Sequence, residues 1–389
     1  MRVGLVLPSL PGYSQTFFRN KINSLVNANF EVFVFADNRL KSDGKHLAVR
    51  YLNGRLSSGL EKIFALLLAF FRIISSPGSA YRLIDLNRTS GLSWKESFRS
   101  LYLSSHIIGY NLDWLHFGFA TMAIGRENLA KAIGAKMAVS LRGFDISVFP
   151  IKNPGCYSQM WKCVDKLHYI SDDLLRLAAE QGFKNFSVAH KITPAIDLDA
   201  IKQRKFNQNH FPIITTTARL HWIKGLEDTL EALALIKQLG YAFRYQIIGD
   251  GPDRERLIFA THQLGLENQV LFCGKLPHSE VFEKLCNSDL YIQYSYSEGF
   301  CNSVIEAQAT GVFCIVSDAE GLSENVLNEQ TGLIVPKRKP EKLAEAIVRV
   351  LEMSGDEKHK FTSHAIERVR TQFDIKQQSL KFIEFYTKN

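Results

Sequence analysis

Two glutamates eight residues apart, Glu298 and Glu306, are the side chains of this 389-residue chain whose types and spacing first suggest chemistry. The run at 289–293 is typical of a β-strand, and the residues after Gly299 predict a helix. Glu298 then lies in the loop at the strand's carboxyl end. Glu306 lies about two turns into the helix at ~3.6 residues per turn. Gly299 lets a ligand approach the backbone closely, so the two carboxylates flank a possible binding loop.

The start of this helix is the third part of the predicted site. We expect Asn302 or Ser303 to cap its first turn, which leaves backbone N–H groups free to bind a phosphate. Carboxylates on both sides of such a helix start suit a ligand with hydroxyl groups at its two ends and phosphates between them. A nucleotide sugar has that shape.

The letters around the two glutamates, E-G-F-x-N-x-x-x-E-A, resemble the signature of retaining glycosyltransferases of family 4. A bare E-x7-E pair is weak, but the flanking Gly, Phe, Asn and Ala make the match specific. The resemblance implies the GT-B fold of the α/β class, in which two Rossmann-like β/α/β domains face each other across a cleft. It implies that Glu306 binds the ribose, that Glu298 holds sugar hydroxyls, and that the residues opening the helix contact the donor: Gly299, Phe300, Cys301 and Asn302.

A pair of cations follows the strand predicted at 213–218. Arg219 and Lys224 lie in a strand-to-helix loop, where a guanidinium fork and a point charge suit a diphosphate. The run A-R-L-H-W-I-K-G resembles the family's G-R-L-x-x-x-K-G except for Ala218. This resemblance implies that the two cations stabilise the leaving group without a metal. It also assigns donor contacts to four residues at other strand ends: Gly249, Gly274, Lys275 and Leu276.

The first half of the chain opens with a β-α-β pattern and contains three further candidates. Gly12 lies in the first loop, where the resemblance places a glycine near the donor diphosphate. His116 and Arg142 are expected to emerge at strand ends that face the cleft, because open α/β sheets bind ligands there. Arg142 stands where many relatives carry a donor-contacting His, so it replaces a titratable ring with a fixed cation.

Net charge divides the chain unevenly. Residues 1–200 hold 24 Lys and Arg against 15 Asp and Glu, a net charge of +9, so the remaining residues carry −1 of the chain's total of +8. A basic first domain suggests an anionic partner: a membrane surface, a lipid diphosphate or nucleic acid. No nucleic-acid-binding motif accompanies the charge, so we predict no nucleic acid partner.

The segment at 39–99 lacks the α/β rhythm of its surroundings. Its apolar run at 63–71 is bracketed by Lys62 and Arg72 and is too short for a span, which takes ~20 residues. Two interpretations stay open. For the apolar run alone we favour a buried helix of the first domain, but the basic neighbours suit a helix lying on an anionic membrane.

Together with these features, the resemblance implies a retaining, metal-independent glycosyltransferase without a cofactor, with Glu298, Arg219, Lys224 and His116 as catalytic residues. The donor is a UDP- or GDP-sugar, held mainly by the second domain. From the resemblance and the basic first domain we expect the acceptor to be a glycan or a lipid-diphosphate-linked glycan of bacterial surface polysaccharide synthesis, bound near Gly12, His116 and Arg142. Two alternatives are a nucleotide-sugar epimerase of the same fold and a non-catalytic nucleotide-sugar-binding subunit.

Chain length favours two domains, and we expect them at 1–200 and 201–373, with a final helix at about 374–389 that packs back on the first. The six cysteines form no C-x-x-C pair and predict reduced thiols, typical of the cytosol. The first residues predict a strand rather than a signal peptide. We therefore expect a cytoplasmic protein, either free or peripheral on the inner face of the cytoplasmic membrane.

Overall fold

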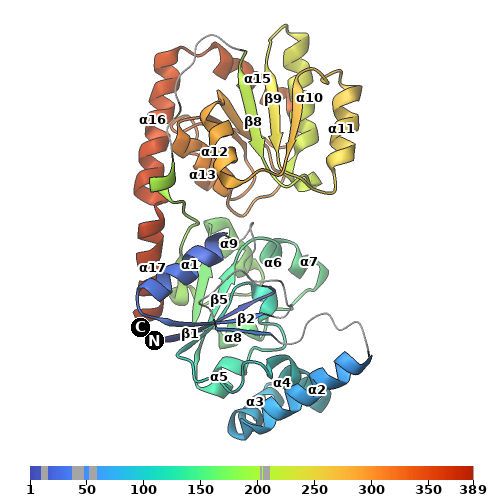
Figure 1. Ribbon diagram of the computed structural model, residues 1–389, viewed down its shortest axis with the longest axis vertical. Coiled ribbons are helices and arrows are strands. Elements are labelled where there is room, and N and C mark those ends of the chain that lie inside the picture. Colours follow the sequence, from blue (N-terminus) through green and yellow to red (C-terminus); the bar gives the residue numbers. More distant parts are fainter. Residues whose placement is uncertain (10–15, 37–47, 52–58, 202–203, 205–210, 389) are drawn as a thin grey trace. The chain divides into compact units, whose positions relative to one another are not determined.

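The computed structural model describes residues 1–9, 16–36, 48–51, 59–201, 204 and 211–388. The chain forms two compact units (Figure 1). Unit 1 comprises Met1–Ile192 and Ser379–Asn389, and unit 2 comprises Thr193–Gln378. The boundary therefore falls eight residues before the predicted one.

Unit 1 is built on a seven-stranded sheet in the order β3-β2-β1-β4-β5-β6-β7, and its recorded strand pairs are all parallel. Its strands are β1 (Arg2–Leu7), β2 (Glu31–Ala36), β3 (Ala48–Tyr51), β4 (Trp114–Phe117), β5 (Lys136–Leu141), β6 (Lys166–Tyr169) and β7 (Ala189–Lys191). Its helices are α1 (Thr16–Asn27), α2 (Gly59–Ile74), α3 (Pro77–Thr89), α4 (Trp94–Ser104), α5 (Leu129–Ile133), α6 (Phe144–Ser147), α7 (Phe149–Lys152), α8 (Met160–Cys163) and α9 (Asp172–Glu180).

Unit 2 contains a six-stranded parallel sheet in the order β10-β9-β8-β11-β12-β13. Its strands are β8 (Ile213–Thr217), β9 (Arg244–Ile248), β10 (Val270–Gly274), β11 (Leu290–Gln293), β12 (Phe313–Ser317) and β13 (Leu333–Val335). Its helices are α10 (Leu226–Gln238), α11 (Arg254–Gln263), α12 (His278–Cys286), α13 (Asn302–Thr310), α14 (Leu322–Asn325), α15 (Pro340–Glu352) and α16 (Gly355–Gln372).

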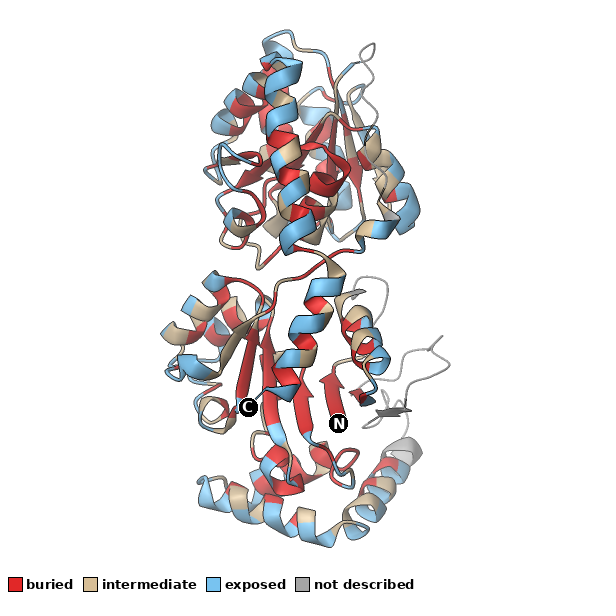
Figure 2. Ribbon diagram, turned by 90° about the vertical axis from the view of Figure 1, so that its left-hand side faces the viewer, coloured by how far each residue is buried: buried red, intermediate tan, exposed pale blue. Residues whose placement is uncertain are grey.

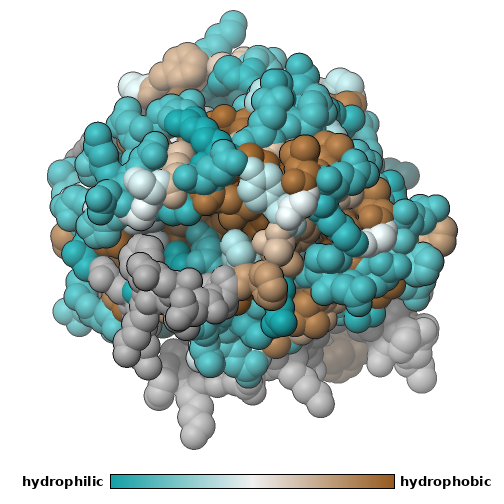
Figure 3. Space-filling model, turned by 90° about the horizontal axis from the view of Figure 1, so that it is seen from above, coloured by the Kyte–Doolittle hydropathy of each residue, from teal (hydrophilic) through white to brown (hydrophobic). Residues whose placement is uncertain are grey.

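The central strands are buried on both faces, which explains their nearly continuous apolar sequences (Figure 2). In β1, for example, every residue from Val3 to Leu7 except Gly4 is an aliphatic side chain, and all five are buried. Figure 3 shows one face of the protein, where hydrophilic side chains predominate and apolar ones gather in smaller groups. The prediction of two α/β domains is confirmed.

The last helix, α17 (Ile375–Thr387), leaves unit 2 and packs on unit 1 (Figure 1). Its side chains Phe382, Phe385 and Tyr386 are buried in the same core cluster as Val3 and Leu5 of β1. Each fully buried aromatic or aliphatic side chain of this kind contributes about 1.5–3 kcal/mol. The carboxyl end of the chain therefore completes the core of unit 1.

Candidate functional site

The strand order of unit 2 reverses between β8 and β11, which are neighbours in the sheet although they are far apart in the chain. Open α/β sheets bind ligands beside such a reversal, at the carboxyl ends of the strands. Arg219 and Lys224 follow β8, and Glu298 follows β11. Gly249 and Lys275 follow β9 and β10 at the same edge. The topology thus gathers the predicted donor residues of unit 2 along one edge.

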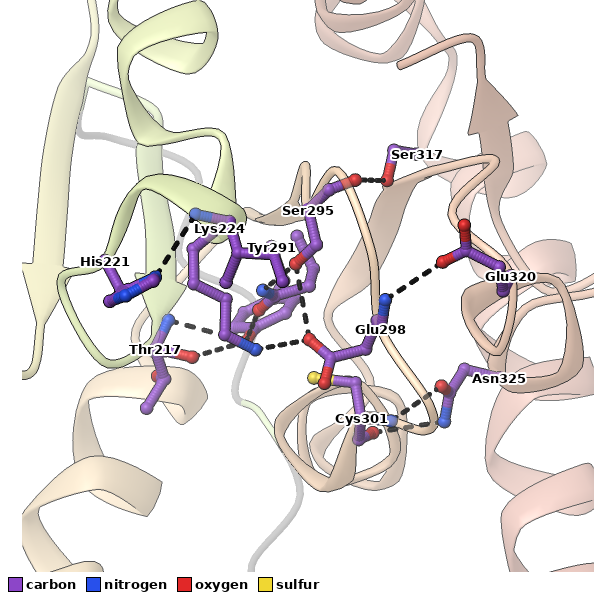
Figure 4. Close-up of polar contacts among 12 residues, drawn as sticks. Thr217, His221, Lys224, Tyr291, Ser295, Glu298, Cys301, Ser317, Glu320 and Asn325 are labelled. Atoms are coloured by element: carbon purple, nitrogen blue, oxygen red, sulfur yellow. Dashed lines mark hydrogen bonds and ion pairs between the residues drawn. The ribbon is translucent and has the colours of Figure 1, made fainter. Parts of the chain in front are cut away.

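Lys224 and Glu298 form an ion pair across this reversal (Figure 4). Both side chains are mostly buried, with exposed fractions of 19% and 15%. Burial alone would lower the pKa of the Lys224 ammonium, but the Glu298 carboxylate outweighs it and the pKa is raised from its ordinary value. The Ser295 hydroxyl also donates a hydrogen bond to Oε2 of Glu298 at 3.3 Å. The site therefore holds a fixed positive charge with a carboxylate as its partner.

Gly225 makes this pairing possible. Its φ of +59° is the left-handed region that favours glycine, and a Cβ there would lie 2.0 Å from the carbonyl oxygen of Tyr294. The loop after β8 can therefore press against the end of β11, which brings Lys224 to Glu298. Gly249 acts similarly, because a Cβ on it would lie 1.9 Å from the carbonyl oxygen of Ala218, directly before Arg219.

Arg219 is exposed and forms no ion pair with any residue that the structure describes. Its guanidinium is therefore available to a ligand beside the Lys224–Glu298 pair. A fork with five donors next to an ammonium matches the charge and geometry of a diphosphate.

Glu306 lies on α13, facing α12. Its carboxylate, with a side chain that is 13% exposed, accepts a hydrogen bond from Nε2 of His278 at 3.0 Å. This hydrogen bond raises the pKa of His278. His278 is not among the residues predicted from the sequence, where its only signal is its position four residues beyond Gly274, after β10.

The start of α13 differs from the prediction. The helix begins at Asn302, and the residue at its cap is Cys301, whose side chain makes no capping bond, so the expectation of an Asn302 or Ser303 cap was wrong. Asn325 supplies the missing contacts: its Oδ1 accepts from the Cys301 N–H at 2.9 Å and its Nδ2 donates to the Cys301 carbonyl at 3.1 Å. Burial raises the pKa of the Cys301 thiol to about 12, so Cys301 stays neutral.

Two further residues that the sequence did not reveal fix the loop between β11 and α13. Glu320 accepts a hydrogen bond from the backbone N–H of Glu298 at 3.2 Å. Lys337 donates to Glu320 and to the carbonyl of Tyr296, both at 3.0 Å. Phe300 is buried against Phe373 in an edge-on contact, with ring centres 5.5 Å apart. The position of Glu298 thus depends on contacts with distant parts of the chain.

The remaining donor candidates of unit 2 lie at the same edge. Gly274 ends β10 with a φ of +68°, and its carbonyl accepts from the N–H of Gly249 at 2.8 Å. Lys275 is exposed, while Leu276 packs against a buried cluster of unit 2. Gly299 is partly buried in the loop after Glu298. A cavity of about 310 Å³ lies nearby, but its lining contains none of the predicted residues.

His116 does not emerge at a strand end, and this expectation was wrong. Its side chain is fully buried in unit 1. His168 Nε2 lies 3.0 Å from the carbonyl oxygen of Ile192, which can only accept, so Nε2 carries the proton. It follows that Ser140 donates to His168 Nδ1 at 2.8 Å and accepts from His116 Nε2 at 2.7 Å. Tyr386 of α17 then donates to His116 Nδ1 at 2.6 Å.

The physical reason is the alternation of side chains along β4. Trp114 and His116 point to the same face of the sheet, and α17 covers that face. Trp114 donates to the carbonyl of Tyr386 at 3.1 Å. Lys21 is also buried there, 3.1 Å from His116 Nδ1. His116 therefore anchors the returning helix instead of facing a ligand.

Arg142 does lie at the carboxyl end of β5. Its guanidinium stacks on Phe17, 3.4 Å from the ring centre, and its Nε donates to the carbonyl of Gly118 at 3.3 Å. Burial lowers its pKa to about 9, and the charge of Asp145 opposes this shift. Gly12, the remaining candidate of unit 1, lies outside the described residues.

The comparisons with known proteins cover the part of the chain that contains this site. Residues 198–368 match the family described as "Glycosyl transferases group 1", a range that includes Arg219, Lys224, Glu298 and Glu306. The chain is 27% identical over 399 residues to the putative colanic acid biosynthesis glycosyltransferase WcaL of Escherichia coli K12, covering 96% of each chain.

Two further comparisons concern the sequence of part of the chain and the fold of the whole chain. Over 38% of each chain it is 31% identical to the N,N'-diacetylbacillosaminyl-diphospho-undecaprenol alpha-1,3-N-acetylgalactosaminyltransferase of Campylobacter jejuni. The crystal structure of Anabaena HepE in complex with UDP and glucose superposes with a TM-score of 0.72 at 15% identity, over 100% of both chains. The fold is GT-B, as predicted. Together, these matches support a glycosyltransferase.

Proposed function

We propose that this protein transfers a sugar from a UDP- or GDP-sugar to a glycan or lipid-linked acceptor with retention of configuration, as a member of family 4. The observation that carries the proposal is the Lys224–Glu298 pair beside the exposed Arg219, at the strand-order reversal of unit 2. Arg219 and Lys224 suit the diphosphate of a nucleotide sugar. The Glu298 carboxylate suits its sugar hydroxyls, and Glu306 on α13 suits its ribose.

The proposed reaction needs no metal and no cofactor. The bond between the anomeric carbon and the diphosphate oxygen breaks, and a bond to the acceptor oxygen forms on the same face of the sugar. The acceptor hydroxyl gives its proton to the departing phosphate. Arg219 and Lys224 stabilise the negative charge that develops on this phosphate, which is the main contribution of the protein to the rate.

In this proposal the donor must compete for groups that are already paired. The diphosphate approaches Lys224, which is bound to Glu298, and the ribose approaches Glu306, which is bound to His278. The interaction of Glu298 with Lys224 can weaken, because the sugar hydroxyls replace Lys224 as hydrogen-bond donors to the Glu298 carboxylate. Binding of the complete donor therefore exchanges internal contacts for equivalent contacts with the ligand.

The acceptor proposal draws on the relatives. WcaL is described as a colanic acid enzyme, and the Campylobacter enzyme acts on a diphospho-undecaprenol acceptor. We propose a lipid-diphosphate-linked glycan of a bacterial surface polysaccharide, processed at the cytoplasmic face of an anionic membrane. The partners are then the nucleotide sugar, this glycan and the membrane, without nucleic acid.

Thermal unfolding with a panel of nucleotides and nucleotide sugars tests the donor. A ligand at ~100 times its Kd adds ~2.7 kcal/mol of stability. One nucleotide sugar should raise Tm, and Glu306→Ala and Arg219→Ala should strongly reduce the rise at the same ligand concentration. Product analysis by NMR then reports the anomeric configuration, with and without EDTA. No shift with any donor, or release of a free sugar epimer without acceptor, would refute the proposal.

A further inference from the structure

Helix α2 turns its large apolar side chains outward. Seven of them, here named the α2 stripe, are each more than half exposed: Ile63, Phe64, Leu66, Leu67, Phe70, Phe71 and Ile74. The buried residues of the same stretch are the small Ala65 and Ala69. The interpretation of this apolar run as a buried helix was therefore wrong.

The α2 stripe forms a continuous surface. At 100° per residue its members occupy an arc of about 160°, and the two buried alanines lie on the other side of the helix. A surface helix of a soluble protein normally has the reverse arrangement, with large apolar residues toward the core. An exposed apolar surface of this size marks an interaction site.

The stretch that contains the stripe and the two helices after it carries an excess of cations. Residues 63–104 hold five Arg and Lys against two Asp and Glu. Arg82, Arg88, Lys95 and Arg99 are exposed on α3 and α4. The exposed Trp94 lies under the guanidinium of Arg88, 4.9 Å from its ring centre. Exposed aromatic and basic side chains beside an apolar helix face are the composition of a helix that lies in the headgroup layer of an anionic membrane.

We propose that the α2 stripe docks unit 1 on an anionic lipid surface, with α2 parallel to the membrane plane. Residues 63–74 form a helix about 18 Å long, whereas the hydrocarbon layer is about 30 Å thick. Within the described residues, no single helix is long and apolar enough to span a membrane; α2 and α3 together pass the test of length and composition, but a 98° bend separates them.

The second helix of this bent pair is held in the protein. Ala80, Leu83 and Asn87 of α3 are buried, and the Asn87 side chain accepts a hydrogen bond from Asn128 at 2.9 Å. Of these two helices, α2 is therefore the one that presents a face of large apolar side chains to lipid. A second copy of the chain is the less suitable occupant, because it would bring the same excess of positive charge to the contact.

The position of α2 also predicts the length of the acceptor, an inference that rests on the proposed function. Helices α2, α3 and α4 lie beyond the amino ends of the strands of unit 1 (Figures 1 and 2), and α3 contacts α5, which leads into the amino end of β5. Ligands of such sheets bind at the carboxyl ends. A six-residue strand such as β1 spans about 20 Å. An acceptor held by lipid must extend over this distance, which requires a chain of several sugars.

Flotation with vesicles tests the docking. The protein should float with vesicles containing phosphatidylglycerol and much less with pure phosphatidylcholine, and high salt should weaken binding. The double variant Leu67→Gln/Phe70→Gln should lower the partition coefficient by about tenfold or more for each side chain. Phe259→Gln, which changes an equally exposed apolar residue of α11, is the matched control and should bind like the wild type.

Three results would overturn the proposal: equal binding to both kinds of vesicle, unchanged binding of the double variant, or a dimer without vesicles that the double variant dissociates. Donor-induced thermal stabilisation should persist in the double variant, because the stripe lies in unit 1. This readout separates failure of docking from failure of the proposed function. Equal transfer to a lipid-linked monosaccharide and to a lipid-linked oligosaccharide would overturn the predicted acceptor length alone.

Discussion

Replacing Glu298 by Gln tests whether its ion pair with Lys224 belongs to a donor site. The substitution keeps the size of the side chain but removes its charge. Breaking a buried ion pair costs about 3–5 kcal/mol, and an exposed pair contributes at most about 1 kcal/mol. With 19% and 15% exposure, this pair lies nearer the buried case, so we expect a loss of about 2–3 kcal/mol. For a unit of this size, Tm should fall by about 4–12 °C.

The same variant should respond to nucleotides in a specific way. Without its carboxylate partner, Lys224 gains more from a diphosphate, so UDP or GDP should stabilise the variant more than the wild type. A nucleotide sugar should show a smaller gain, because the contact of Glu298 with the sugar hydroxyls is lost. Calorimetric titration of the nucleotide and of the matching nucleotide sugar measures both affinities.

Glu329→Gln is the matched control. Glu329 pairs with Arg349 on the surface of unit 2, where both side chains are about half exposed, so its loss should cost at most about 1 kcal/mol. If Glu298→Gln lowers Tm no more than this control and leaves nucleotide affinity unchanged, the Lys224–Glu298 pair has no part in donor binding. A double variant that also carries Lys224→Met should regain much of the lost stability, because no unpaired charge remains buried.

Three further predictions follow from the same contacts. Arg219→Ala should weaken donor binding by about ten- to hundredfold, the value of a charge-assisted hydrogen bond, and Arg219→Lys should recover part of it in calorimetry. The raised pKa of His278 means that its bond to Glu306 is fully present below its unfolded pKa of 6.5 and is lost as pH rises through the higher folded pKa. Donor affinity should therefore be lower at pH 6 than at pH 8, because His278 competes with the ribose for the Glu306 carboxylate. A His278→Ala variant that keeps this pH difference would contradict this explanation. Burial lowers the pKa of His116 and His168, so both are neutral when folded, and unit 1 should lose stability as pH falls below 6.5; a melting temperature equal at pH 7.5 and pH 5 would contradict this.

The pattern of apolar residues was enough to predict many strands, because strands buried on both faces require unbroken apolar runs. The strands predicted at 213–218 and 289–293 form at Ile213–Thr217 and Leu290–Gln293. The loops that carry Arg219 and Glu298 could be located in the same way, since each begins where such a run ends. The reversal of strand order between β8 and β11, which brings these loops together, is a property of topology that no local pattern contains.

Contacts over long sequence separations produced the errors. His116 is buried by Tyr386, 270 residues further along the chain. Asn325 replaces the local cap expected at α13, and it comes from the short helix after β12. A residue's type and neighbours do not show which element will cover it.

The sequence by itself determined the α/β class, the two-domain organisation and the residues available for donor chemistry, because hydrophobic period and side-chain type are local properties. The tertiary structure alone decided which of these residues meet. It paired Lys224 with Glu298 and buried His116 beneath the returning α17. It also exposed the apolar face of α2, because the alanines of that helix, rather than most of its large side chains, are buried.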